Sequence, residues 1–191
     1  MAGLGALSVL VTGANCGIGL ELVRQLLGSS DLPQWLFACC QDPDGEHGQK
    51  LRKLASSHPN LTIVKLDTCD PSSIKAAVAR ATEQLNRSRL NLLINNAGIV
   101  RQHTLESETS ERMSEVYKTN VIGPMMVTQA FLPLLRKASE DGSQKGMSCS
   151  KAAIVNISSL CGSITDILAW ELGLNINYRC SKFPGGHQSR Q

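Results

Sequence analysis

The amino-acid sequence predicts an α/β protein with a doubly wound parallel sheet, covered by helices on both faces in three αβα layers. Two observations lead to this prediction. Short, continuous apolar runs, typical of parallel strands that are buried on both faces, alternate with segments of helical periodicity. The length of 191 residues, of which 42% are hydrophobic, fits one domain with a sizeable core.

Five apolar runs are the predicted strands of this sheet. Helical patterns separate most of them, and such alternation is typical of βαβ units, which place successive strands parallel to one another. A final run follows a polar segment. The runs cover residues 7–11, 35–40, 61–66, 90–94 and 152–157.

Two helices are predicted from side-chain spacing and capping. Residues 18–27 place several aliphatic side chains on one helical stripe. Residues 72–85 follow Asp70 and Pro71, which are a capping residue and a proline at the first helical position. Both segments are therefore expected to cross between neighbouring strands of the sheet.

A longer helical stretch covers residues 110–137 and contains Pro124 and Pro133. Because proline removes a backbone donor and clashes with the preceding turn, we expect a kink or a break into two helices. The polar residues 138–150 that follow are predicted to form an exposed loop.

Composition and charge exclude several classes of function. The formal charge of +3 comes from 19 Lys and Arg scattered among 16 Asp and Glu, so nucleic acid is not an expected partner. No apolar stretch approaches the roughly 18 residues of a membrane span, and the N-terminus lacks a signal-peptide pattern. Seven cysteines without a C-x-x-C motif and four scattered histidines predict reduced thiols and no metal site. We therefore expect a cytoplasmic protein.

A glycine-rich turn joins the first predicted strand to the first predicted helix. Glycine permits a tight turn close to a pyrophosphate, and the helix N-terminus offers unpaired N–H groups and a partial positive charge. An ordinary strand-to-helix turn is the alternative, but the strand–turn–helix context favours a dinucleotide site. The residues expected to contact the cofactor here are Thr12, Gly13, Asn15, Cys16, Gly17, Ile18 and Gly19.

Further motifs follow the glycine turn in a fixed order. They are Leu66-Asp67-Thr68, Asn95-Asn96-Ala97-Gly98, Asn120, and Ser159 with Tyr178-x-x-x-Lys182. With the spacing T-G-x-x-x-G-x-G, this ordered set resembles the short-chain dehydrogenase/reductase family, and the residues around the motifs are most similar to C-factor and sniffer-like carbonyl reductases. The resemblance implies an NAD(P)-binding, Rossmann-type domain over residues 1–182.

The resemblance also implies four catalytic residues. Tyr178 and Lys182 are four positions apart, so a helix places both side chains on one face. In the family, the tyrosine donates a proton to the carbonyl oxygen as hydride arrives from the nicotinamide, and the lysine favours the phenolate and holds the nicotinamide ribose. Ser159 would bind the substrate oxygen, and Asn120 would anchor a water of the proton relay. Taken singly, each has an ordinary structural explanation, but the ordered set favours catalysis.

Further cofactor contacts follow from the same resemblance. Asp67 would accept a hydrogen bond from the adenine amino group, with Thr68 beside it, although a simple turn residue is the alternative for Asp67. Asn95, Asn96, Ala97 and Gly98 would line the floor of the cofactor site and tie neighbouring strands together, while Tyr178 and Lys182 would approach the nicotinamide end.

The choice between NADP and NAD depends on the end of the second predicted strand. An acidic residue there would bond the ribose 2′-hydroxyl of NAD, whereas a basic residue accommodates the 2′-phosphate of NADP. Cys40 takes the place of the acid, while Gln41 and Cys16 take two places that are often basic. Because no carboxylate at position 40 repels the phosphate, we predict NADP, and Asp42 is the residue that could reverse this choice toward NAD.

The sequence departs from the family pattern after Lys182. Residues 183–191 read FPGGHQSRQ, and a proline followed by two glycines predicts that the helix ends near Lys182. We therefore expect a non-family tail and a truncated domain that lacks the last strands and the substrate lobe. Residues 152–157 would then form an exposed sheet edge, and the helix pair by which family members dimerise would be incomplete.

The first functional hypothesis is an oxidoreductase of this family that reduces a small carbonyl compound with NADPH. The expected truncation would weaken folding, nicotinamide binding and turnover, and the homo-oligomers common in the family are less expected of this chain. The alternative is a truncated, non-catalytic isoform that acts as a nucleotide-binding or interaction module. Ser158 and Ser163 stay open as rivals of Ser159, and residues 164–174 are either one wall of a substrate pocket or a packed loop.

Overall fold

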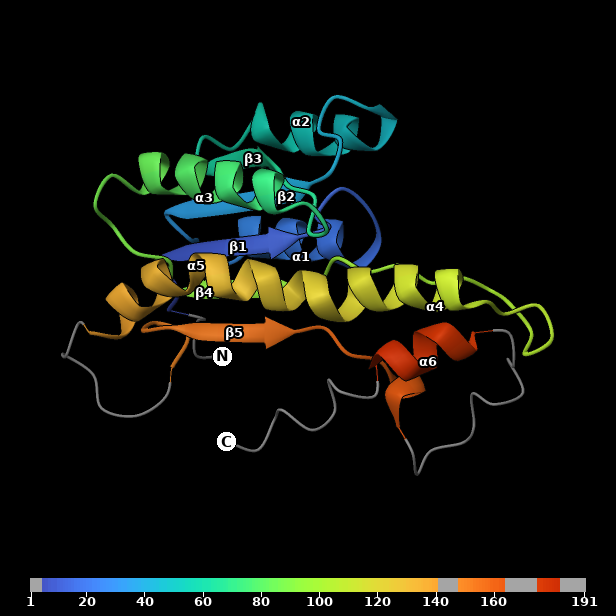
Figure 1. Cartoon of the computed structure of the whole chain (residues 1–191). Helices are drawn as coiled ribbons and strands as arrows, with labels where there is room; N and C mark the ends of the chain where they lie inside the picture. Colours follow the sequence, from blue (N-terminus) through green and yellow to red (C-terminus); the bar gives the residue numbers. More distant parts are fainter. Residues whose placement is uncertain (1–4, 141–147, 164–174, 183–191) are drawn as a thin grey trace.

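A five-stranded parallel sheet forms the centre of the protein (Figure 1). The computed structural model describes residues 5–140, 148–163 and 175–182. Its strands lie in the order β3-β2-β1-β4-β5, so the order reverses direction between β1 and β4. The strands are β1 (Ser8–Thr12), β2 (Trp35–Cys40), β3 (Leu61–Lys65), β4 (Leu92–Asn95) and β5 (Ala153–Asn156). All five predicted strands are confirmed, with bounds that differ by at most two residues.

Helices cover both faces of this sheet in Figure 1, as predicted for a doubly wound fold. One helix was not predicted: α2 is only seven residues long and carries too few apolar positions to show a period. The helices are α1 (Gly17–Leu27), α2 (Gln49–Ala55) after the 3-10 turn η1 (Glu46–Gly48), α3 (Pro71–Leu85), α4 (Ser110–Tyr117), α5 (Gly123–Ser139) and α6 (Ile176–Lys182).

Alternate side chains of each strand enter one of two core layers, because successive side chains of a strand point to opposite faces. On one face, Phe37 packs in a fully buried cluster with Phe131 of α5 and the apolar stripe of α3. On the other face, Leu36 packs with Val23 of α1 and Leu51 of α2. This division produces the three αβα layers, and it explains why the strands read as continuous apolar runs.

The long helical stretch is interrupted earlier than its prolines predicted. A π-helical turn, η2 (Lys118–Ile122), separates α4 from α5, and the three segments follow one another as a single rod in Figure 1. Pro124 is the second residue of α5, directly after the π turn, and Pro133 lies inside that helix. The expected interruption is therefore present, but it is made by the π turn. Such turns widen a helix locally and occur often at functional sites.

A buried amide at Asn91 joins three strands at the opposite end of the sheet from the glycine turn. Its Oδ1 accepts hydrogen bonds from the backbone N and the hydroxyl of Ser8, at 3.2 and 2.9 Å. Its Nδ2 donates to the carbonyl oxygens of Ser150 and Lys151, at 2.7 and 2.8 Å. Asn91 is 1% exposed, so these four bonds satisfy a side chain that would otherwise be costly to bury.

Among the described strands, β5 forms one edge of the sheet, as predicted, and its side chains Ile154 and Val155 are 40% and 38% exposed. Within the described residues, no helix is both long and apolar enough to cross a lipid bilayer. The predicted tail 183–191, the segment 164–174 and most of the predicted loop, residues 141–147, lie outside the described residues.

Replacing the buried amide tests its contribution to the fold. We expect Asn91→Leu to lower the free energy of unfolding by about 2–4 kcal/mol, because Ser8 N–H and two carbonyl oxygens lose their partners. The same change at exposed Gln102, Gln102→Leu, should cost within about 0.5 kcal/mol. Denaturant unfolding of both variants measures the difference, and equal losses would contradict the assignment.

Candidate active site

The sequence motifs converge at the carboxyl ends of the strands. Because the sheet is parallel, the segments that follow β1, β2, β3, β4 and β5 all leave from the same edge. Ligands of open α/β sheets bind at this edge, where the strand order reverses. In this chain the reversal lies between β1 and β4, so the site is expected around the glycine turn and the segment after β4.

The glycine turn after β1 has the geometry of an anion-binding cradle. Gly13 and Gly17 adopt positive φ angles of 63° and 50°, which other residues rarely take. A Cβ on Gly13 would lie 2.8 Å from the Cα of Ala97, whereas a Cβ on Gly17 would project into open space. Gly19 packs against the turn itself, since its Cβ would lie 2.2 Å from the carbonyl oxygen of Gly13. Cys16 precedes α1 without capping it through its side chain.

Thr12 and Asn96 tie the glycine turn to the segment after β4. The Thr12 hydroxyl accepts hydrogen bonds from the backbone N of Asn96 and of Ala97, both at 3.0 Å. In return, the Asn96 amide donates to the carbonyl oxygens of Thr12 and Gly13, at 2.9 and 3.1 Å. These four bonds fix the position of the glycine turn relative to the segment after β4.

A cavity of about 660 Å³ opens beside this turn, and we call it the glycine-turn cavity. Its volume falls within the usual range for cofactor and small-molecule sites. It brings together nine of the residues predicted to contact the cofactor. These are Gly13, Asn15, Cys16, Gly17, Ile18, Gln41, Thr68, Ala97 and Gly98.

Six predicted cofactor residues do not line the glycine-turn cavity, and two of them, Tyr178 and Lys182, lie on α6. Thr12 and Gly19 are buried behind it and shape the turn. The Asp67 carboxylate accepts a hydrogen bond from the backbone N of Cys69 at 2.8 Å, which matches the alternative of a turn residue. Asn95 donates from Nδ2 to Thr128 and Asn156, at 3.1 and 2.9 Å, and faces a different cavity.

No carboxylate at the end of β2 lines the glycine-turn cavity. Burial raises the pKa of the Cys40 thiol, and the nearby Asp42 carboxylate adds to this, so the thiol stays neutral at neutral pH. Asp42 Oδ1 accepts hydrogen bonds from the backbone N of Asp44 and Gly45, at 3.2 and 3.0 Å. Its carboxylate therefore stabilises the turn after β2, while the cavity is lined by Cys40 and Gln41.

A second cavity of about 600 Å³, here called the α6 cavity, adjoins the first at Ala97, which lines both. Polar side chains at one end of it are Asn120, Ser158, Ser181 and Lys182. The remaining walls come largely from η2, α5 and β5. The two cavities are thus neighbours at Ala97, in the segment after β4.

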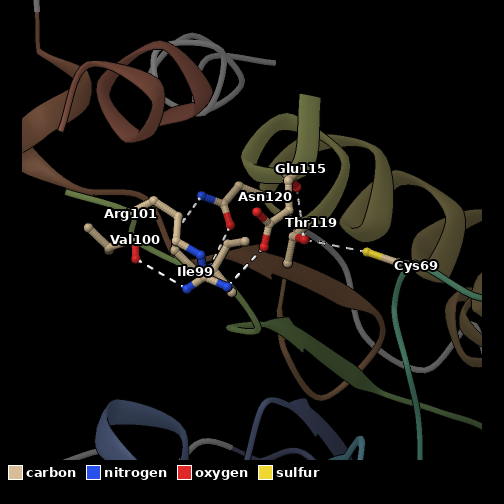
Figure 2. A network of polar contacts seen from close by, with 7 residues as sticks. All are labelled: Cys69, Ile99, Val100, Arg101, Glu115, Thr119 and Asn120. Carbon is tan, nitrogen blue, oxygen red and sulfur yellow. Dashed lines mark hydrogen bonds and ion pairs between the residues drawn. The ribbon is translucent and has the colours of Figure 1, made fainter. Parts of the chain in front are cut away.

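Asn120, in the π turn η2, links the loop after β4 to α6. Its Oδ1 accepts a hydrogen bond from the backbone N of Ile99 at 2.8 Å, and its Nδ2 donates to the carbonyl oxygen of Ile99 at 2.9 Å (Figure 2). The same Nδ2 donates to the Ser181 hydroxyl on α6 at 2.9 Å. One buried amide therefore holds both the loop after β4 and the helix that carries Tyr178.

Tyr178 and Lys182 lie on one face of α6, as their spacing predicted. The Lys182 ammonium lies 5.5 Å from the centre of the Tyr178 ring, and it donates to the carbonyl oxygen of Ile157 at 2.8 Å. Burial lowers the pKa of Lys182. Lys182 lines the α6 cavity, whereas the half-buried Tyr178 lines neither of the two cavities.

The three candidate serines differ in their surroundings. Ser159 caps the 3-10 turn η3 (Leu160–Gly162), where its hydroxyl accepts a hydrogen bond from the backbone N of Cys161 at 3.2 Å. Ser158 lines the α6 cavity, and Ser163 ends the turn. The turn packs closely on α6, because a Cβ on Gly162 would lie 2.4 Å from the carbonyl oxygen of Lys182. All three serines therefore remain near the end of α6.

Sequence reasoning missed an ion pair that lines the glycine-turn cavity. Arg101 Nη2 lies 2.9 Å from Glu115 Oε1, and both residues line the cavity together with Ile99 and Thr119 (Figure 2). Neither residue belongs to a sequence motif, because Arg101 lies in an irregular loop and Glu115 lies on α4. Asn96, which belongs to the motif predicted to form the cofactor floor, and Leu66, which begins another quoted motif, also line this cavity.

The described residues fit a dinucleotide in the glycine-turn cavity. The side chain that Gly17 lacks leaves space at the mouth of the cavity, next to the first turn of α1. The N-terminus of that helix offers N–H donors and a partial positive charge to a phosphate. The hydrogen bonds of Thr12 and Asn96 fix the backbone of the turn that borders this space.

Comparisons with known proteins agree with this geometry. The family model described as short chain dehydrogenase matches residues 8–184. A carbonyl reductase from chicken fatty liver, solved with NADPH bound, is 57% identical, with a TM-score of 0.92 over 96% of this chain and 68% of that chain. The carbonyl reductase Sniffer of Drosophila melanogaster is 33% identical, with a TM-score of 0.84 over 93% of this chain and 70% of that one.

Curated relatives show the same relation at the sequence level. Mouse estradiol 17-beta-dehydrogenase 2 is 33% identical over 161 residues, which are 82% of this chain and 37% of that protein. An uncharacterized oxidoreductase of Schizosaccharomyces pombe is 32% identical over 83% of this chain and 56% of its own length. The chain thus spans between about a third and somewhat over half of these relatives. The motifs, the sheet topology and the family match together show that the chain belongs to the short-chain dehydrogenase family of oxidoreductases.

Proposed function

We propose that this protein binds NADPH in the glycine-turn cavity and reduces a small carbonyl compound beside α6, next to Tyr178 and Lys182. The observation that carries the proposal is the meeting of the two cavities at Ala97, with a phosphate-binding turn on one side and Asn120 and Lys182 on the other. The chicken carbonyl reductase with bound NADPH, at 57% identity, supports the same cofactor and reaction class.

Each candidate residue has a defined part in this proposal. When bound, NADPH supplies a hydride to the carbonyl carbon. The Tyr178 hydroxyl donates a proton to the carbonyl oxygen, so that the product is an alcohol, and the Ser159 hydroxyl donates a hydrogen bond to the same oxygen. Lys182 has three N–H donors, one of which goes to Ile157, and the others are available to ribose hydroxyls. Asn120 positions α6 through Ser181.

The preference for NADPH over NADH rests on the end of β2. Cys40 and Gln41 line the cavity as neutral groups, and the Asp42 carboxylate is occupied by two backbone N–H groups of its own turn. A 2′-phosphate therefore meets no carboxylate in the lining at this strand end, and the nearby Asp42 carboxylate is held by its own turn. A direct test is titration of the 191-residue chain with NADPH and NADH, followed by assays with a panel of aldehydes and quinones.

Adding one methyl group at Gly17 should weaken NADPH binding much more than it lowers the stability of the fold. We expect Gly17→Ala to lower NADPH affinity by on the order of tenfold, because the methyl group enters the phosphate-binding space. The positive φ should cost only about 1 kcal/mol of stability. Gly28→Ala, at the other end of α1, has a normal φ of −89° and should leave affinity unchanged. Fluorescence titration checks both variants, and equal affinities would count against this cavity as the cofactor site.

Removing one hydroxyl should separate turnover from binding. We expect Tyr178→Phe to lower turnover by about 100-fold or more, because the proton donor is lost, while NADPH affinity changes less than about twofold. Oxidation of NADPH at saturating carbonyl substrate measures the effect. Full turnover by the phenylalanine variant would exclude Tyr178 as the acid. NADPH binding without turnover in the unmodified chain would favour the non-catalytic nucleotide-binding module.

The three serines can be ranked by parallel substitutions. We expect Ser159→Ala to lower turnover by about 100-fold, since a donor to the developing oxyanion is worth roughly that much. Ser158→Ala and Ser163→Ala should each have less than about a tenfold effect. The same NADPH assay compares all three, and a larger loss at Ser158, which lines the α6 cavity, would reassign the role.

A further inference from the structure

One ion pair supplies all the formal charge at the lining of the glycine-turn cavity. Arg101 Nη2 and Glu115 Oε1 lie 2.9 Å apart, and among the described lining residues Arg101 is the one cation and Glu115 the one anion. Arg101 comes from the loop after β4 and Glu115 from α4, so the pair spans the two elements that border the cavity (Figure 2).

The cavity otherwise has little positive charge to offer a phosphate. Cys16 at the glycine turn and Gln41 after β2 supply no positive charge, and burial raises the pKa of the Cys40 thiol. The first turn of α1 contributes a partial charge equivalent to roughly half a proton. A dinucleotide carries at least two negative charges on its pyrophosphate, so a further cation would bind it well. Among the described lining residues, Arg101 is the one that can do so.

The backbone beside Arg101 is fixed, whereas its side chain is free to exchange partners. Asn120 holds both the N–H and the carbonyl of Ile99, two residues before Arg101, at 2.8 and 2.9 Å. The Arg101 and Glu115 side chains are 45% and 50% exposed, and an ion pair in such surroundings contributes little. Replacing the carboxylate by a phosphate therefore sacrifices little, and the guanidinium can bind phosphate oxygens through two N–H groups.

We propose that Arg101 is the cation that binds a phosphate group of the dinucleotide, and that Glu115 is the counter-ion from which it is released. This inference rests on the proposed function, because it concerns the same cofactor site. Glu115 then has two effects, since it keeps Arg101 at the cavity rim and competes with the phosphate for it. Removing the arginine weakens cofactor binding, and removing the glutamate strengthens it. The two halves of one ion pair thus act with opposite signs.

A purely structural ion pair behaves differently. If Arg101 and Glu115 only connected the loop to α4, loss of either partner would disturb the cavity in the same direction. The chain offers a matched control on α3, where Arg80 and Glu83 lie 2.7 Å apart outside the cavity and are similarly exposed. Arg80→Gln removes the same charge at the same solvent exposure without touching the site.

The test is titration of the full 191-residue chain with NADPH and with NADH, in low and high salt. We expect Arg101→Gln to weaken NADPH binding by about tenfold, the size of one charge-assisted hydrogen bond. Glu115→Gln should tighten it by about threefold, the size of an exposed ion pair. Arg80→Gln should stay within twofold. The salt dependence of binding should be smaller in Arg101→Gln than in the unmodified chain.

The two cofactors identify which phosphate is bound. A loss with both NADPH and NADH assigns the pyrophosphate, and a loss with NADPH alone assigns the 2′-phosphate. Either result supports the proposal. An effect of Arg101→Gln below twofold, or equal weakening by Arg101→Gln and Glu115→Gln, would overturn it while the proposed function stands. Failure of the unmodified, cooperatively melting chain to bind either cofactor would overturn both.

Discussion

The contact between the glycine turn and the segment after β4 is the constraint on which the rest of the site depends. The side chains of Thr12 and Asn96 make four hydrogen bonds between the two segments, and Gly13 must lack a side chain because Ala97 occupies that space. The backbone groups involved leave regular strands at this point, so side chains have to replace the sheet bonds they lose. The same contact fixes the backbone of Ala97, the residue that lines both cavities. The hydrogen bonds of this contact therefore set where the two cavities meet.

A second constraint links these cavities to the catalytic helix. Asn120 reaches Ile99 and Ser181 from a π turn, in which one extra residue turns the side chain toward the loop after β4. The helix α6 has seven residues, a length that is marginal without tertiary contacts. Its order therefore depends on its neighbours: Asn120, the η3 turn that packs on Lys182, and the contact between Asn177 and Glu108. The geometry of Tyr178 is thus set by the same amide that holds the cofactor loop.

Much of the fold and part of the site could be predicted from the sequence, for physical reasons. Buried parallel strands are apolar on both faces, so the five runs were visible, and Asp70 with Pro71 marked a helix start that the structure confirms. The helix α2 is too short for periodicity to show it, and Asn91 is a polar residue in an apolar run whose partners lie 59 to 83 positions away. Interactions at such separations leave no local pattern in a single sequence.

The ion pair at the glycine-turn cavity illustrates this limit most clearly. The sequence showed that Cys16 and Gln41 lack the charges that often accompany a 2′-phosphate, and this left the source of positive charge open. Arg101 and Glu115 are 14 positions apart and belong to a loop and a helix that only the fold brings together. A sequence motif consists of residues within one element or turn, so their spacing in the sequence is constant. A charged residue that faces a cavity can come from any element that borders it, and its position in the sequence then follows no fixed spacing. Whether this cavity complements the charge of a phosphate therefore depends on which residues the fold brings to its lining, and this can be judged only from the folded structure.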